Sequence, residues 1–274
     1  MSTPPEAATV MASSRPLRTS DLARAVGIHP NTVRRYIDWG LLPPVDRSPS
    51  GYRIFTQQHL DCLRLVRLIY AAEYPGPALR STSNDIIQQA VAGDWPGALG
   101  KARAHLAAVG AEIDQANHAA ALLEQWARTR TTTPPERPLS IGAVSARLGV
   151  SLDVVRNWER NGLLEVPRNP HNQYRLFGQA EIERMQIIRM LSRAGYSHMA
   201  ILRMFIALDG GQTGDLKAAL DTPRPDEDIF TAADHWLSTL HAQSALCQEI
   251  IQFIVTVLKR DLEQDLEQGK QTGL

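Results

Sequence analysis

An internal repeat is the feature that most constrains what this 274-residue chain can fold into. Residues 17–79 align with residues 139–201 at an offset of 122 positions without a gap, and 15 of the 63 aligned pairs are identical. The identities concentrate at glycines, arginines and apolar residues. Gly-Leu-Leu and Tyr-Arg-x-Phe recur at the same separation in both copies. A duplicated structural unit is therefore expected, and the fold of one copy predicts that of the other.

Each copy predicts two short helices joined by a glycine-containing turn. In the first copy, Thr19-Ser20 can cap a helix that runs through Ala25, with Gly27 as the left-handed residue that ends it. A second helix is expected from Pro30 to Trp39, stopped by Gly40. The second copy repeats this plan with Ser140 as cap, a helix over 141–148, Gly149 in the turn, Ser151 as second cap and Gly162 as the stop. This arrangement predicts a helix-turn-helix in each copy.

A short hairpin, or wing, is expected after each pair of helices. Residues 52–55 and 174–177, both Tyr-Arg-x-Phe, alternate with the period of a strand. Ser50-Gly51 and His171-Asn172 precede them as plausible turns. The fold class predicted is mainly α, with two tandem winged helix-turn-helix modules, each followed by helices that end in a coiled-coil helix.

The second helix of each copy has an outward face suited to DNA. Val33 and Ile37 are expected to face inward, and Val155 is expected to do so in the second copy. The outward residues are then Asn31, Arg34, Arg35 and Asp38 in the first copy and Arg156, Asn157 and Arg160 in the second. Arginine can pair with guanine and asparagine with adenine in the major groove, and either can reach a phosphate.

These motifs resemble those of the MerR-type winged helix-turn-helix regulators. Residues 32–41, Thr-Val-Arg-Arg-Tyr-Ile-Asp-Trp-Gly-Leu, are similar to the family signature Thr-Ile-Arg-Tyr-Tyr-Glu-x-x-Gly-Leu, and residues 51–55 to its wing. Residues 154–163 keep the arginine, the glutamate and the glycine, with Trp158 in the aromatic place. Arg35 and Ile37 depart from the signature, which leaves the contact at position 35 open.

The resemblance implies that Arg34 and Tyr36 contact DNA from the recognition helix and that Arg53 does so from the wing. Taken with the outward pattern, the full set of expected DNA-binding residues is Asn31, Thr32, Arg34, Arg35, Tyr36, Arg53, Asp153, Arg156, Asn157, Trp158, Arg160 and Arg175. Because the two recognition helices differ, an imperfect palindrome is expected as the binding site.

Two later segments carry apolar residues at alternating spacings of three and four. They are Leu106, Val109, Ile113, Ala116, Ala120, Leu123 and Ala127, and Leu237, Leu240, Ser244, Cys247, Ile251, Ile254 and Leu258. Each predicts a coiled-coil seam about 30 Å long that needs a partner. We expect the two halves of the chain to pair as an intramolecular pseudo-dimer that reads half-sites about 34 Å apart. Pairing in a homodimer is the alternative.

The expected domains follow from these patterns. They are a disordered tail over 1–14, a first winged module over 15–80, a helical segment with the first coiled-coil helix over 81–128, a proline-containing linker over 129–138, a second winged module over 139–205, and a helical segment with the second coiled-coil helix and tail over 206–274.

Other site types find little support in the sequence. His59 and Cys62 could supply two metal ligands, but no further soft ligands lie nearby in sequence, so no metal and no cofactor are expected. Tyr70, Tyr74, Trp95 and Trp236 could line a pocket for a planar drug, although a small structural cluster is the simpler interpretation. No nucleophile motif or phosphate loop is recognisable, so an enzyme is not expected.

Charge and composition complete the prediction. Lysine plus arginine and aspartate plus glutamate both total 29, but residues 15–70 and 137–193 are basic and the last 81 residues are acidic. No apolar run approaches the ~20 residues that a membrane span needs, and no secretory signal is recognisable, so a cytoplasmic, nucleoid-associated protein is expected.

The expected function is sequence-specific regulation of transcription, with promoter DNA and RNA polymerase as partners. By the resemblance, the protein distorts promoter DNA between two half-sites. A drug-sequestering protein built on the same scaffold and an architectural DNA-bending protein are the alternatives.

Overall fold

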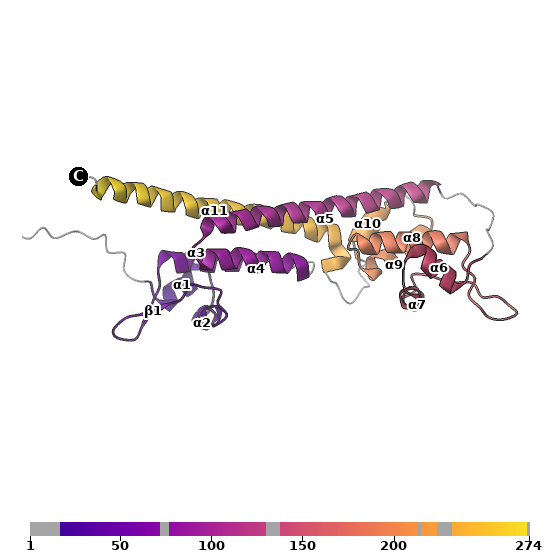
Figure 1. Cartoon of the computed structure of the whole chain (residues 1–274), viewed down its shortest axis with the longest axis horizontal. Helices are drawn as coiled ribbons and strands as arrows, with labels where there is room; N and C mark the ends of the chain where they lie inside the picture. Colours follow the sequence, from indigo (N-terminus) through magenta and orange to yellow (C-terminus); the bar gives the residue numbers. More distant parts are fainter. Residues whose placement is uncertain (1–16, 72–76, 130–137, 213–214, 224–231, 273–274) are drawn as a thin grey trace, which may run out of the picture. The chain divides into compact units, whose positions relative to one another are not determined.

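The computed structural model describes residues 17–71, 77–129, 138–212, 215–223 and 232–272, and helices dominate them (Figure 1). In chain order the helices are α1 Thr19–Ala25, α2 Pro30–Asp38, α3 Gln57–Ile69, α4 Pro77–Val91, α5 Trp95–Thr129, α6 Ile141–Leu148, α7 Leu152–Arg160, α8 Gln179–Arg193, α9 His198–Asp209, α10 Leu216–Asp221 and α11 Trp236–Thr272. A 3₁₀ turn at Ala232–His235 precedes α11. The mainly helical fold class is confirmed.

Both predicted helix-turn-helix pairs are present, at nearly the predicted bounds. In the first copy α1 begins at Thr19, with Arg18 as its N-cap and Gly27 at φ +67° after its end. In the second copy Ser140 and Ser151 accept backbone N–H groups of α6 and α7 through their hydroxyl oxygens. These short-range signals act within one helical turn, which explains why the sequence locates the helices well.

A two-stranded antiparallel hairpin forms the wing of the first copy. Its strands are β1 Asp46–Arg47 and β2 Arg53–Ile54, and Arg47 lies opposite Arg53. In the second copy the wing has an isolated bridge, between Arg168 and Arg175, and backbone hydrogen bonds from Asn169 to Tyr174 and from Leu176 to Pro167 join its two sides. The loop holds Gln173 at φ +61°, where the first wing has a left-handed Gly51. A non-glycine residue in that conformation strains the backbone of the second wing.

Two compact units make up the chain, and each draws on both halves of the sequence. The first unit contains residues 1–71, 82–102 and 249–274, and the second contains residues 72–81 and 103–248. The long helices α5 and α11 are therefore each divided between the two units. Each unit holds one of the two helix-turn-helix modules.

In the first unit, the end of α11 packs on the first module. Arg260 of α11 forms an ion pair with the buried Asp61 of α3, with 2.8 Å between Nη1 and Oδ2. The ring of Phe253 lies edge-on to Trp95, at 6.5 Å between centroids. Ile250, Ile254 and Val257 are buried on the same helix, so the apolar face is wider than the predicted seam.

In the second unit, α5 packs on the second module. Gln115 donates a hydrogen bond to the carbonyl oxygen of Arg193, and Tyr196 donates one to the carbonyl oxygen of Ala116. The indole N–H of Trp126 points to the carboxylate of Glu183, at 3.4 Å. Glu183 is the repeat counterpart of Asp61, so in both modules this acidic position contacts a long helix from the other half of the sequence.

The core of the second unit joins these elements in one apolar cluster. It includes Val109, Ala116, Ala119 and Leu123 from α5, together with Leu237, Leu240 and Cys247 from the start of α11. Large residues of the module, among them Trp158, Phe177 and Phe205, belong to the same cluster. The predicted seam residues are thus buried or half-buried, and in this unit several of them belong to the same apolar cluster as the module.

Candidate nucleic-acid interface

The first candidate recognition helix, α2, has one buried and one exposed face. His29 caps it by accepting the backbone N–H of Asn31, at 3.1 Å from Nδ1. Val33 is fully buried, and Asn31, Arg34, Arg35 and Asp38 are exposed as predicted. Ile37 is only half-buried, and so is Thr32.

The exposed side of α2 carries cationic groups held by neutral partners. Arg34 donates to the side-chain oxygen of Asn31, at 2.8 Å. The guanidinium of Arg35 lies 4.6 Å from the centre of the exposed Trp39 ring. Cation–π contact limits the freedom of Arg35 and leaves its charge available.

The second candidate recognition helix, α7, is built in the same way but carries an acid. Val155 is buried, Asp153, Arg156 and Arg160 are exposed, and Asn157 is half-buried. Nη1 of Arg156 lies 3.1 Å from Oδ1 of Asp153, its i−3 neighbour. This ion pair occupies the place that Arg34 and Asn31 have in α2.

The aromatic residue of each recognition helix is buried in the free protein, and the expected contact of its side chain with DNA stays a prediction. Tyr36 is 7% exposed and Trp158 is 3% exposed. A ring of this size stabilises most when it is removed from water, and here it anchors the helix to its module. Tyr36 and Trp158 thus hold α2 and α7 against their modules, on the side away from the exposed arginines.

The first wing presents two arginines without acidic partners. Arg47 donates to the carbonyl oxygen of Gly51, at 3.1 Å. Arg53 is half-buried, and within the described residues its side chain has no hydrogen bond or ion pair. Tyr52 lies between them in the hairpin and is 76% exposed. The wing is therefore a cationic projection with an exposed aromatic ring.

The second wing is arranged differently because Glu159 of α7 binds its arginines. Arg175 Nε lies 2.8 Å from Oε2 of Glu159, and Arg168 Nη2 lies 3.7 Å from Oε1. Sequence reasoning predicted Arg175 but missed Arg168 and Arg47. In each wing the missed arginine lies directly across the hairpin from the predicted one. Pairing the two strands of each predicted hairpin would therefore have found Arg47 and Arg168.

Neither residue of the suggested metal pair is placed to bind an ion. The His59 ring accepts from the N–H and hydroxyl of Thr56 at Nδ1, and Nε2 lies 3.2 Å from the carbonyl oxygen of Pro44. Burial lowers the pKa of His59 and raises the pKa of Cys62 to about 12. The thiol of Cys62 points to the carbonyl oxygen of Ala90. Among the described residues, no three His, Cys, Asp or Glu side chains form a group that could hold a metal ion.

The aromatic residues suggested for a drug pocket serve mainly as packing. Trp95 and Trp236 are buried, and the Tyr70 hydroxyl donates to the side-chain oxygen of Asn84. Tyr74 lies outside the described residues. At the three described positions these aromatic side chains are thus engaged in contacts within the protein, which agrees with a structural role better than with the alternative of a drug pocket.

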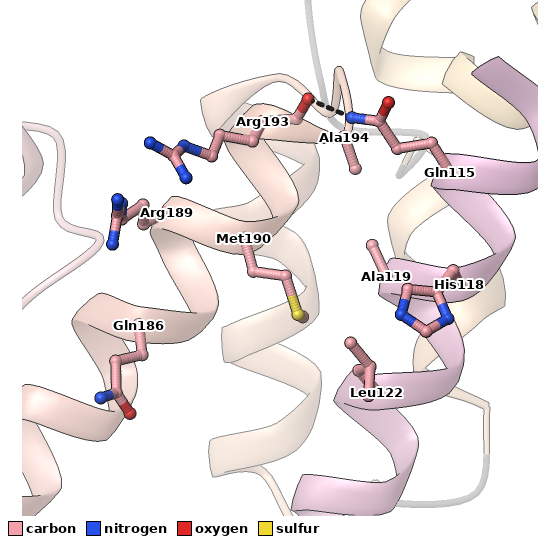
Figure 2. A pocket seen from close by; sticks show the side chains of 9 residues that line it. All are labelled: Gln115, His118, Ala119, Leu122, Gln186, Arg189, Met190, Arg193 and Ala194. Carbon is pink, nitrogen blue, oxygen red and sulfur yellow. Dashed lines mark hydrogen bonds between the residues drawn. The ribbon is translucent and has the colours of Figure 1, made fainter. Parts of the chain in front are cut away.

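A groove of about 310 Å³ lies elsewhere, between α5 and α8 in the second unit (Figure 2). Figure 2 shows the Met190 side chain lying toward Ala119 and Leu122, with Arg189 and Arg193 on the α8 side. None of the nine residues that line this groove is acidic. The groove thus has an apolar floor at Ala119, Leu122 and Met190, with polar residues around it.

No helix among the described residues is long and apolar enough to span a bilayer.

The two helix-turn-helix pairs, each followed by a wing, define a protein with two tandem winged helix-turn-helix modules.

Comparison with known families places both modules in one class. The model of the MerR HTH family regulatory proteins matches residues 17–73 and 139–207, so the chain carries two tandem MerR-type modules. The structure and this match agree on the duplication that the 122-residue offset predicts.

Curated relatives match over part of their length. The mercuric resistance operon regulatory protein of Shigella flexneri is 32% identical over 73 residues, which are 27% of this chain and 50% of that protein. The HTH-type transcriptional regulator CueR of Escherichia coli O157:H7 is 43% identical over 51 residues, 19% of this chain and 38% of that protein. The chain thus spans half or less of these relatives' length. No solved structure matches it significantly.

Proposed function

We propose that this protein is a sequence-specific DNA-binding regulator of transcription. The observation that carries the proposal is the repeated exposed arginine face, with Arg34 on α2 and Arg156 on α7, each beside a wing that bears a further arginine. Arginine at these positions can reach both base edges and phosphates. The names of the matched relatives, a regulatory protein of an operon and a transcriptional regulator, support the same function.

In the proposed mechanism, α2 and α7 enter the major groove at two half-sites, and Arg53 and Arg175 contact flanking phosphates. The exposed residues of the two helices differ, with Asn31 and Arg35 in one and Asp153 and Asn157 in the other. The half-sites are therefore non-identical. Distortion of the duplex between them would realign promoter elements for RNA polymerase.

Replacing Arg34 with alanine tests the interface. Fluorescence anisotropy on duplexes from around the protein's own locus should show nanomolar, sequence-dependent binding by the wild type. The Arg34→Ala variant should bind about 10-fold more weakly, and its salt slope should fall by about one. Arg103→Ala, an exposed arginine of α5 far along the chain from the module, is the matched control. Equal affinity of Arg34→Ala and wild type at matched salt would exclude a DNA contact by Arg34. A reporter gene driven by the bound site then separates a transcription regulator, which changes its expression, from an architectural protein, which does not.

We further propose that one chain supplies both modules as an intramolecular pseudo-dimer. What supports this is that residues 249–274 complete the first unit and residues 103–129 belong to the second. Each module thereby obtains a long-helix partner from the other half of the same chain. The alternative is a homodimer in which these helices also contact a second copy.

Sedimentation equilibrium distinguishes the two arrangements. The pseudo-dimer should sediment as a 30.3 kDa monomer at low micromolar concentration, because the predicted seam residues of its long helices are already buried or half-buried within one chain. A mass twice this value under the same conditions would rule out the strictly monomeric form.

A further inference from the structure

The two modules pair the same arginines with partners of different charge. Arg34 and Arg156 are repeat counterparts, 122 positions apart. Arg34 contacts the neutral side chain of Asn31, whereas Arg156 contacts the carboxylate of Asp153. The full positive charge of Arg34 is thus available to a ligand, while that of Arg156 is partly neutralised.

The wings show the same difference through a second pair of positions. Arg53 and Arg175 are counterparts, and so are Ile37 and Glu159. Ile37 offers Arg53 no charge, but Glu159 binds Arg175 at 2.8 Å and Arg168 at 3.7 Å. The side chain of Glu159 is only 23% exposed, so water screens this interaction less than at an open surface.

The exposed acids of the first module do not pair with its arginines as Asp153 and Glu159 do in the second module. Asp38 and Asp46 are exposed there, yet neither forms an ion pair within the described part of the chain. Two acidic positions, Asp153 and Glu159, therefore account for the paired arginines of the recognition helix and wing of the second module.

We infer that the first module is the dominant polyanion-binding surface of this protein and that Asp153 and Glu159 weaken the second. A phosphate that approaches Arg175 must compete with a carboxylate already in place, and that carboxylate also repels it. At Arg53 a phosphate meets no such competitor. That the two half-sites on DNA differ in affinity rests on the proposed function. The difference in available positive charge between the two modules does not depend on it.

Four single variants and two kinds of polyanion test the inference. Glu159→Gln removes the competing charge from the second module, and Glu165→Gln, an exposed acid of the same module, is the control with the same change in net charge. Ile37→Glu installs the competitor in the first module, with Ile37→Gln as the uncharged control. Each protein is eluted from a heparin column with a salt gradient and titrated against duplex DNA, after its thermal melt is compared with wild type.

Glu159→Gln should elute from heparin later than Glu165→Gln, and Ile37→Glu earlier than Ile37→Gln. On DNA, Glu159→Gln should bind about fivefold more tightly, with a steeper salt dependence, because one more arginine becomes free for a phosphate. If Glu159→Gln elutes with its control or earlier, Glu159 instead positions Arg175 for the ligand and the inference is overturned. Coelution of Ile37→Glu with Ile37→Gln also overturns it. If the wild type binds heparin but no duplex DNA, the proposed function is rejected and the inference is not. The order in which the variants elute from heparin then still tests whether the two modules differ in available charge.

Discussion

Replacing Arg260 with alanine is expected to lower the free energy of unfolding by about 2–3 kcal/mol. Arg260 Nη1 lies 2.8 Å from Oδ2 of Asp61, and Asp61 is 1% exposed in the core of the first unit. Removing the guanidinium leaves a buried carboxylate whose remaining neighbours are the Gln57 amide at 3.0 Å and Arg64 at 3.9 Å. Because Gln57 and Arg64 still contact Asp61, the loss of unfolding free energy should be smaller than for a buried charge that has no remaining partner.

Urea unfolding followed by circular dichroism measures this loss, with Lys259→Ala as the control. Lys259 precedes Arg260 on α11 and is exposed, so its removal should cost less than about 0.5 kcal/mol. Combining Arg260→Ala with Asp61→Asn should recover part of the loss, because the second change removes the uncompensated charge. Equal stability of Arg260→Ala and Lys259→Ala would contradict the proposed attachment of α11 to the first module.

Replacing Gly195 with alanine is expected to destabilise the second unit by about 3 kcal/mol. Gly195 lies in the turn between α8 and α9 at φ +96°, where a side chain strains the backbone. An added Cβ would also overlap the ring of Trp236, because the nearest ring atoms lie closer than any normal van der Waals contact allows. Trp236 is buried at the start of α11, so the ring has little room to move.

Gly211→Ala separates the two causes of this loss. Gly211 has φ +81°, but an added Cβ there meets no atom within 4 Å. Its alanine variant should cost only the backbone strain, about 1 kcal/mol. Tryptophan fluorescence should change in Gly195→Ala and not in Gly211→Ala. Equal losses in the two variants would show that contact with Trp236 does not limit packing at this turn.

Much of each module could be predicted from the sequence because its signals are local. Caps at Ser140 and Ser151, and left-handed glycines at 27, 149 and 162, act over one helical turn and appear as expected. Val33 and Val155 are buried as the helical pattern predicts. The duplication itself needs only comparison of the chain with itself.

The side chains of the candidate site were predicted less completely. Tyr36 was assigned to DNA contact by resemblance and Ile37 to the core by spacing, yet the structure buries Tyr36 more deeply than Ile37. Two adjacent residues on a helix lie 100° apart, so both border the same boundary between core and solvent. Which of them turns inward depends on the packing of the module around them.

The sequence by itself thus determined the repeated modules, their helix ends and the exposed arginines, since interactions among near neighbours in the chain set all of these. Only the tertiary structure decided that residues 249–274 complete the first unit and that Asp61 meets Arg260. It alone also decided that Glu159 binds the second wing while Ile37 leaves Arg53 unpaired by any acid. Those contacts join residues that are distant along the chain, and their free energy depends on burial and geometry that exist only once the units have assembled.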